Sequence, residues 1–270
     1  MKKEMYSSEV TLLRDTFRRL LRRHAKTNIV KLIDKTHPSD LALIFRHFND
    51  TEQDSIFSNM SASEETVKFL YELDESIATR LIENETPERL AEIMEQASSN
   101  EQAFLMGLVN DQFASSVIDL LQAEEQEELE EMMAYPEDSA GILMYTDVFT
   151  LHEETKAREA IYALQDQEEA EMVFYLYTLD DDGRLTGVIS LRDLVTTPSD
   201  TMLKDIMSKN IQVVRPETDQ EEVARIVSQY NFLAVPVVDA NEKLLGIVTV
   251  DNVVDVIREE ATEDFLQLAG

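Results

Sequence analysis

The sequence predicts an all-α superhelical domain followed by an α/β region built from two β-α-β-β-α repeats. Three observations lead to this fold class. Up to about Met133 the apolar spacing is helical with almost no glycine, after Gly141 β-branched runs alternate with helical stretches, and the second half repeats itself. We place an acidic helical domain at residues 1–135 and the two repeats at residues 136–200 and 201–265.

The first half carries apolar residues three and four positions apart, as in Leu13, Phe17, Leu20 and Leu21. Two of its segments resemble each other, PSDLALIFRHF at 38–48 and PERLAEIMEQA at 87–97, and each has proline in the first helical turn. This repetition predicts short helices stacked into a superhelix.

The second half holds two copies of one unit. In the first copy, LMYTDVFTL is followed by an expected helix at 156–165, the strand MVFYLYTL, a turn and GVISLRDLV. In the second copy, IMSKNIQVV is followed by an expected helix at 221–229, the strand AVPVVDA, a turn and GIVTVDNVV. The turn at 180–183 lacks the alternating acids and the distal glutamate of a calcium loop, so we interpret it as a hairpin turn. One unit is too small to bury its sheet, so we expect the copies to pack together.

Composition excludes several classes of function. The 270 residues carry a formal net charge of −31, although residues 1–35, with ten basic and four acidic side chains, carry +6. Such a negative chain repels nucleic acid, and the absence of cysteine favours a reducing compartment, the cytoplasm. No eighteen apolar residues run together, so we expect a soluble chain. The four histidines lack metal-ligand spacing and no P-loop or nucleophile elbow occurs, so we expect no enzyme.

The second half resembles a tandem CBS (cystathionine-β-synthase) pair. The hallmark glycine, two aliphatic residues, hydroxyl residue and Asp or Asn stand at Gly187, Val188, Ile189, Ser190 and Asp193, and again at Gly246, Ile247, Val248, Thr249 and Asn252. With the acidic helical domain and the connection AYPEDSAGILM at 134–144, the chain resembles the cytosolic region of the MgtE family of Mg²⁺ transporters. This resemblance implies a homodimer through the CBS domains, at the cytoplasmic face of the cell membrane, and a membrane pore domain beyond Gly270.

The resemblance also implies that Mg²⁺ binds between acidic surfaces and closes the domains to gate that pore. The implied ligands are Glu88, Glu92, Asp219, Glu221, Asp251, Asp255, Glu260, Glu263 and Asp264. Facing carboxylates repel one another, so we expect the domains to stay apart until a cation lies between them. The residues alone also fit solvated acidic faces, and Thr218-x-x-Glu221 fits a capping box. Asn231 and Asn252 stand where family members have aspartate.

A nucleotide-binding regulatory module is the alternative function, because CBS pairs commonly bind adenine nucleotides such as ATP or AMP. The candidate residues are Tyr175, Ser190, Arg192, Asp193 and Phe232. Serine would meet phosphate or ribose, aspartate the ribose hydroxyls, arginine the phosphate charge and the aromatic rings the base. Ser-x-x-Asp at a helix start is also a capping pattern, and the aromatic residues are equally suited to a core. A purely structural scaffold is the third interpretation.

The segment RDTFRRLLRRHAK at 14–26 is basic and amphipathic. Such a segment is suited to a membrane surface or to the acidic body of a partner subunit, and equally to a packed helix with one solvated face.

Overall fold

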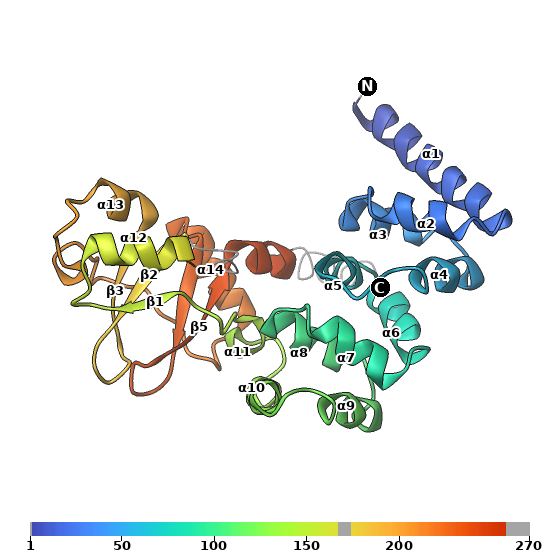
Figure 1. Cartoon of the computed structure of the whole chain (residues 1–270). Coiled ribbons are helices and arrows are strands. Elements are labelled where there is room, and N and C mark those ends of the chain that lie inside the picture. Colours follow the sequence, from blue (N-terminus) through green and yellow to red (C-terminus); the bar gives the residue numbers. More distant parts are fainter. Residues whose placement is uncertain (1, 167–173, 258–270) are drawn as a thin grey trace. The chain divides into compact units, whose positions relative to one another are not determined.

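The computed structural model describes residues 2–166 and 174–257 (Figure 1). The chain forms two compact units, Met1–Leu129 and Glu130–Gly270. Within the described ranges, no helix has the length and apolar character needed to span a membrane.

The first unit is helical, as predicted. Its helices are α1 (Lys2–Arg22), α2 (Lys26–Ile33), α3 (Pro38–Phe45), α4 (Asp50–Phe57), α5 (Glu64–Tyr71), α6 (Glu75–Glu83), α7 (Pro87–Met94), α8 (Ser99–Gly107), α9 (Asp111–Ile118) and α10 (Ala123–Met133). Helix α3 contacts α5, α5 contacts α7, and α7 contacts α9. Each of these helices therefore packs against the next helix but one along the chain, which is the predicted superhelical arrangement.

The similar segments at 38–48 and 87–97 begin equivalent helices. Pro38 and Pro87 are the first residues of α3 and α7, where a missing N–H costs no intrahelical hydrogen bond. Phe45 of α3 lies edge-on to Phe69 of α5, with ring centroids 4.9 Å apart, and Phe48 lies edge-on to Phe17 of α1 at 6.1 Å. This chain of aromatic rings joins the first helices into one core.

The second unit has the predicted repeat. Its elements are α11 (Ala140–Leu143), β1 (Thr150–His152), α12 (Ala157–Asp166), β2 (Tyr175–Leu179), β3 (Leu185–Ser190), α13 (Leu191–Thr196), the 3-10 helix η1 (Leu203–Asp205), α14 (Gln220–Tyr230), β4 (Ala234–Val238) and β5 (Leu244–Thr249). Residues 250–257 are helical. Strand β2 pairs in parallel with β1 and antiparallel with β3, while β4 pairs antiparallel with β5. In the second copy the first strand is reduced to a parallel bridge between Val214 and Val237.

Both hairpins close with the same turn. Asp180 Oδ1 accepts hydrogen bonds from the backbone N–H groups of Asp182 and Arg184, at 2.9 and 2.8 Å. Asp239 Oδ1 accepts two such bonds from Asn241 and Lys243. These backbone N–H groups lower the pKa of both aspartates. The carboxylate therefore closes a hairpin, as predicted.

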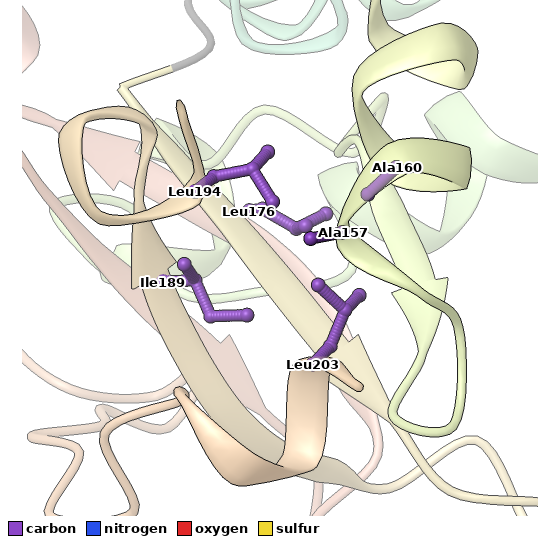
Figure 2. Packing of buried hydrophobic residues seen from close by; sticks show 6 residues of the cluster. All are labelled: Ala157, Ala160, Leu176, Ile189, Leu194 and Leu203. Carbon is purple, nitrogen blue, oxygen red and sulfur yellow. The ribbon is translucent and has the colours of Figure 1, made fainter. Parts of the chain in front are cut away.

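Buried side chains from α12, β2, β3, α13 and η1 form one core, and the partly buried Leu151 of β1 packs against it (Figure 2). The cluster consists of Ala157 and Ala160 from α12, Leu176 from β2, Ile189 from β3, Leu194 from α13 and Leu203 from η1. Figure 2 shows these side chains converging around Leu176. This packing fixes β3 against α13, at the junction where the CBS hydroxyl residue stands.

The two copies exchange backbone pairs across their interface. Tyr145, near the start of the first copy, donates to and accepts from Ile247 of β5 at 2.8 and 2.9 Å. Ser208, near the start of the second copy, does the same with Val188 of β3 at 2.9 and 3.1 Å. Tyr177 is buried in the interface with Ile247. The copies therefore pack together, as expected, and each completes the other.

The connection between the units is paired with the second copy. The Gln220 N–H donates to the Asp138 carbonyl oxygen, and the N–H groups of Ala140 and Gly141 donate to the carbonyl oxygens of Thr218 and Pro216, all at 2.8 Å. The connection that follows the helical domain thus pairs with the second copy of the repeat before the chain continues into the first copy.

Candidate functional site

Two of the implied magnesium ligands lie on α7. Glu88 and Glu92 are both exposed, on the face opposite the buried Leu90 and Ile93. The backbone N–H of Glu88 and the Thr86 hydroxyl lower the pKa of the Glu88 carboxyl. The exposed Glu92 Oε2 lies 3.6 Å from the guanidinium of the half-buried Arg89. The helix therefore presents two carboxylates, one turn apart, to solvent.

The start of α14 holds the next pair. Asp219 is the N-cap, and its Oδ1 accepts a hydrogen bond from the Glu221 N–H at 2.9 Å. The expected capping box between Thr218 and Glu221 is therefore wrong, because the Thr218 hydroxyl instead accepts from the Arg215 N–H at 2.9 Å. Both carboxylates are on exposed residues. Asp219 Oδ1 caps the helix, and Asp219 Oδ2 takes no part in that hydrogen bond.

The terminal acidic segment is described in part. Asp251 is exposed and Asp255 is half-buried in the helical stretch 250–257. Glu260, Glu263 and Asp264 lie outside the described residues. Within residues 2–166 and 174–257, no three carboxylate or imidazole side chains are grouped to hold a metal ion.

Asn231 and Asn252 both have local structural roles. Asn231 ends α14 in the left-handed conformation, with φ 52° and ψ 43°, which asparagine adopts more readily than most residues. Asn252 is 4% exposed and its Oδ1 accepts a hydrogen bond from the Thr249 hydroxyl at 2.6 Å. Neither position presents a carboxylate.

The nucleotide candidates meet partly at the end of β3. Tyr175 and Ser190 stand directly opposite each other in the β2–β3 pair, so their side chains share one face of the sheet. The Ser190 hydroxyl donates to Asp193 Oδ2 at 2.7 Å and accepts from the Asp193 N–H at 3.1 Å, which caps α13. Arg192 is exposed beside them. Phe232 instead stacks on Tyr230, with centroids 5.4 Å apart.

The equivalent corner of the second copy is closed. Ala234 stands opposite Thr249, so the aromatic ring of the first copy has no counterpart there. Thr249 and Asn252 are buried, whereas Ser190 is half-buried and Asp193 exposed. The two corners thus differ in exposure, charge and stacking surface.

Sequence reasoning missed two tyrosines. Tyr177 is 2% exposed, its hydroxyl has no hydrogen-bond partner among the described residues, and burial raises its pKa. Tyr135 lines a groove of about 470 Å³ with Arg215, Glu217 and Asp239. Burial, followed by nearby carboxylates including Glu217, raises the pKa of Tyr135. The alternation in YLYTL was the available signal for Tyr177, because it puts Tyr175 and Tyr177 on one face.

Comparison with known proteins extends these observations. Residues 36–138 match the MgtE intracellular N domain, and residues 140–200 and 203–259 each match the CBS domain. Magnesium transporter MgtE of Enterococcus faecalis is 42% identical over 149 residues, which cover 55% of this chain and 33% of that protein. Magnesium transporter MgtE of Bacillus subtilis is 29% identical over 240 residues, covering 88% of this chain and 53% of that protein. The chain thus spans about a third to a half of the curated relatives it matches.

Similarity to solved structures extends along nearly all of the chain. The crystal structure of the cytosolic domain of the Mg²⁺ channel MgtE in complex with ATP is 31% identical, has a TM-score of 0.84, and is matched over 90% of this chain and 99% of that one. A stacked helical domain followed by an interlocked CBS pair defines a regulatory region of the kind found in transporters. The chain belongs to the MgtE family of magnesium transporters, which is not an enzyme family.

Proposed function

We propose that this chain is the Mg²⁺-sensing cytosolic region of a magnesium transporter or channel, and that it gates a membrane pore domain of the same protein. The observation that carries the proposal is the match along 90% of the chain to the cytosolic domain of the Mg²⁺ channel MgtE. In this function the chain works at the cytoplasmic face of the cell membrane and catalyses no reaction.

Exposed carboxylates supply the sensing chemistry. Glu88 and Glu92 on α7, Asp219 and Glu221 at the start of α14, and Asp251 all lie on exposed residues. Mg²⁺ takes oxygen ligands and keeps several of its waters, so it suits carboxylates that meet loosely across a gap. We propose that these groups, with Asp255, Glu260, Glu263 and Asp264, face one another when the domains close.

Charge supplies the movement. Without cations, carboxylates on facing surfaces repel one another and favour the open state. Magnesium bound between them favours the closed state, and the population moves toward closure only as far as the closed form binds the ion more tightly. Several weak sites acting together make that response steep.

A homodimer through the CBS domains is supported by an apolar face that occurs at equivalent positions in both repeats of the chain. The Leu191 N–H donates to the Phe174 carbonyl oxygen at 3.4 Å, and the Val250 N–H donates to the Leu233 carbonyl oxygen at 2.9 Å, so these positions are equivalent. Phe174 and Leu233 are 39% and 40% exposed. Val195 and Val254, one turn into the helices that follow, are 63% and 40% exposed. Burying four such side chains favours association.

Nucleotide binding is a second candidate function, favoured by the open corner of the first copy. There the ring of Tyr175, the hydroxyl of Ser190 and the carboxylate of Asp193 stand together, and the solved relative is a complex with ATP. Isothermal titration calorimetry with ATP and AMP, with and without Mg²⁺, tests this. Heat beyond that of the same titration without protein, in either buffer, establishes nucleotide binding, and no such heat in either buffer overturns it.

Small-angle scattering tests the sensing proposal. The radius of gyration should be smaller in millimolar Mg²⁺ than in chelator, and the double variant Glu88→Gln/Glu92→Gln should show a reduced change. The matched control Glu75→Gln/Glu83→Gln removes two exposed carboxylates from α6 and should respond as the unmodified chain does. An equal radius with and without Mg²⁺ would overturn the proposal.

A further inference from the structure

Helix α1 presents a basic groove on an otherwise acidic chain. Asp15, Arg18, Arg19, Arg22 and Arg23 line a groove of about 380 Å³. Residues 1–35 carry +6 of the total −31, so residues 36–270 carry −31 − 6 = −37. The net positive charge thus lies in residues 1–35, which contain α1 and α2.

Two of the arginines on α1 are already engaged. Arg14 pairs with Asp15 at 2.9 Å. Arg18 donates to the His47 carbonyl oxygen at 2.6 Å and its guanidinium lies 5.8 Å from the centroid of the Phe48 ring, so it fastens α1 to the turn after α3. The Arg18 contacts hold α1 against that turn, whereas the Arg14 pair stays within the helix.

Three other arginines point outward. Arg19, Arg22 and Arg23 are exposed, and they form no ion pair with any residue in the described ranges. Arg19 and Arg22, three residues apart, lie on one side of consecutive turns of α1, and Arg23 is in the turn that directly follows the helix. Leu12, seven residues before Arg19, is 69% exposed and lies on the same side. The outer face of α1 therefore combines a cluster of guanidinium groups with an exposed apolar side chain.

Helix α10 has the complementary face. Its sequence is AEEQEELEEMM. Glu127, Glu130 and Glu131 are exposed, have the same spacing of three and four, and form no ion pair with a described residue. Met133 beside them is 40% exposed. Both helices thus offer three like charges in the same spacing next to one exposed apolar side chain.

We propose that α1 of one copy of this chain docks on α10 of a second copy, with Arg19, Arg22 and Arg23 against Glu127, Glu130 and Glu131. Residues 36–270 carry a net charge of −37. A second copy of this chain therefore offers an acidic protein surface to these arginines. Each copy carries both helices, so two such contacts related by a two-fold axis would close two copies into a pair. It is polar and separate from the apolar CBS face.

Charge exchange tests the docking. At 0.1 M salt, sedimentation velocity should show that Arg19→Glu/Arg22→Glu/Arg23→Glu and, separately, Glu127→Lys/Glu130→Lys/Glu131→Lys lose the association step, with a dissociation constant raised at least about tenfold. An equal mixture of the two variants should regain it, since acidic α1 then meets basic α10. Their formal charges are −31 − 6 = −37 and −31 + 6 = −25, so overall attraction cannot produce that result.

The control variant Lys26→Glu/Lys31→Glu/Lys35→Glu makes the same charge change on and beside α2 and should associate as the unmodified chain does. A mixture that fails to associate would overturn the proposal, as would unaltered association of the arginine variant. Co-sedimentation with phosphatidylglycerol vesicles gives the competing outcome. Capture that depends on the three arginines, with self-association unchanged, would assign the groove to an anionic membrane and overturn docking on a second copy.

Discussion

Gly246 faces the backbone of Tyr145 so closely that a Cβ atom on the glycine would lie 2.5 Å from the Tyr145 carbonyl oxygen. The CBS glycine is therefore required by a backbone contact between segments about a hundred residues apart. The equivalent Gly187 faces the side chain of Met207, where a Cβ atom would lie 2.3 Å from the sulfur. A flexible side chain moves aside more easily than a paired backbone.

Gly246→Ala should lower the free energy of unfolding by about 1–3 kcal/mol, because the Tyr145–Ile247 pair has to shift. Gly187→Ala should cost less. Gly107→Ala, where no atom lies within 4 Å, is the control and should leave stability equal or raise it by up to about 1 kcal/mol. Urea unfolding followed by circular dichroism measures all three. Equal losses at Gly246 and Gly107 would contradict the steric explanation.

Tyr177→Phe should raise the free energy of unfolding by about 1 kcal/mol, since it removes a buried hydroxyl without a described partner. Burial, and then Tyr175, raises the pKa of Tyr177 in the folded state. The stability linked to this group is therefore complete below the unfolded pKa of about 10 and is lost as the pH rises above it. The variant should lose less stability between pH 9 and pH 11. A steeper loss would contradict this prediction.

In the Arg19→Glu/Arg22→Glu/Arg23→Glu background, which removes the proposed α1–α10 contact, Val195→Glu/Val254→Glu should convert a CBS-face dimer to monomer, because both exposed valines would place carboxylates in the contact. Light scattering after size-exclusion chromatography measures the mass. Val30→Glu, a valine 36% exposed on α2, should leave the mass unchanged. A dimer that survives the double substitution would exclude this face.

Asp193→Asn should weaken ATP binding at least about tenfold if the first-copy corner takes the ribose, measured by calorimetry. The helix cap persists, because Ser190 Oγ accepts from the backbone N–H of residue 193. Asp205→Asn, an exposed aspartate in η1, should bind as before. Unchanged affinity in the Asp193 variant would remove this corner from the nucleotide site.

Local chemistry was predictable from sequence where one residue decides the backbone. Pro38 and Pro87 start helices, because a backbone N–H at that position would have no intrahelical partner. Ser190 caps α13, because its hydroxyl accepts a hydrogen bond from a free backbone N–H. The Thr218 capping box failed for a physical reason. Thr218 and Asp219 are both good caps, and a tight turn at Arg215 takes the threonine hydroxyl.

Contacts between distant segments were not predictable. No local signal says that Tyr145 pairs with Ile247 or that Ser208 pairs with Val188, since each pairing depends on how the two copies meet. For the candidate sites, sequence predicted which carboxylates exist. It did not predict that Asp219 spends one oxygen on a helix cap, or that Thr249 and Asn252 are buried together.

The attachment of residues 138–145 to the second repeat has a mechanical consequence. Strand β5 holds Tyr145 and leads straight into the helical stretch 250–257. Tension applied to residues 250–257 would reach the connection at residues 138–145 through β5 alone. It would not pass through the rest of the first repeat. The shortest route for force through this protein is thus far shorter than the route along its covalent chain.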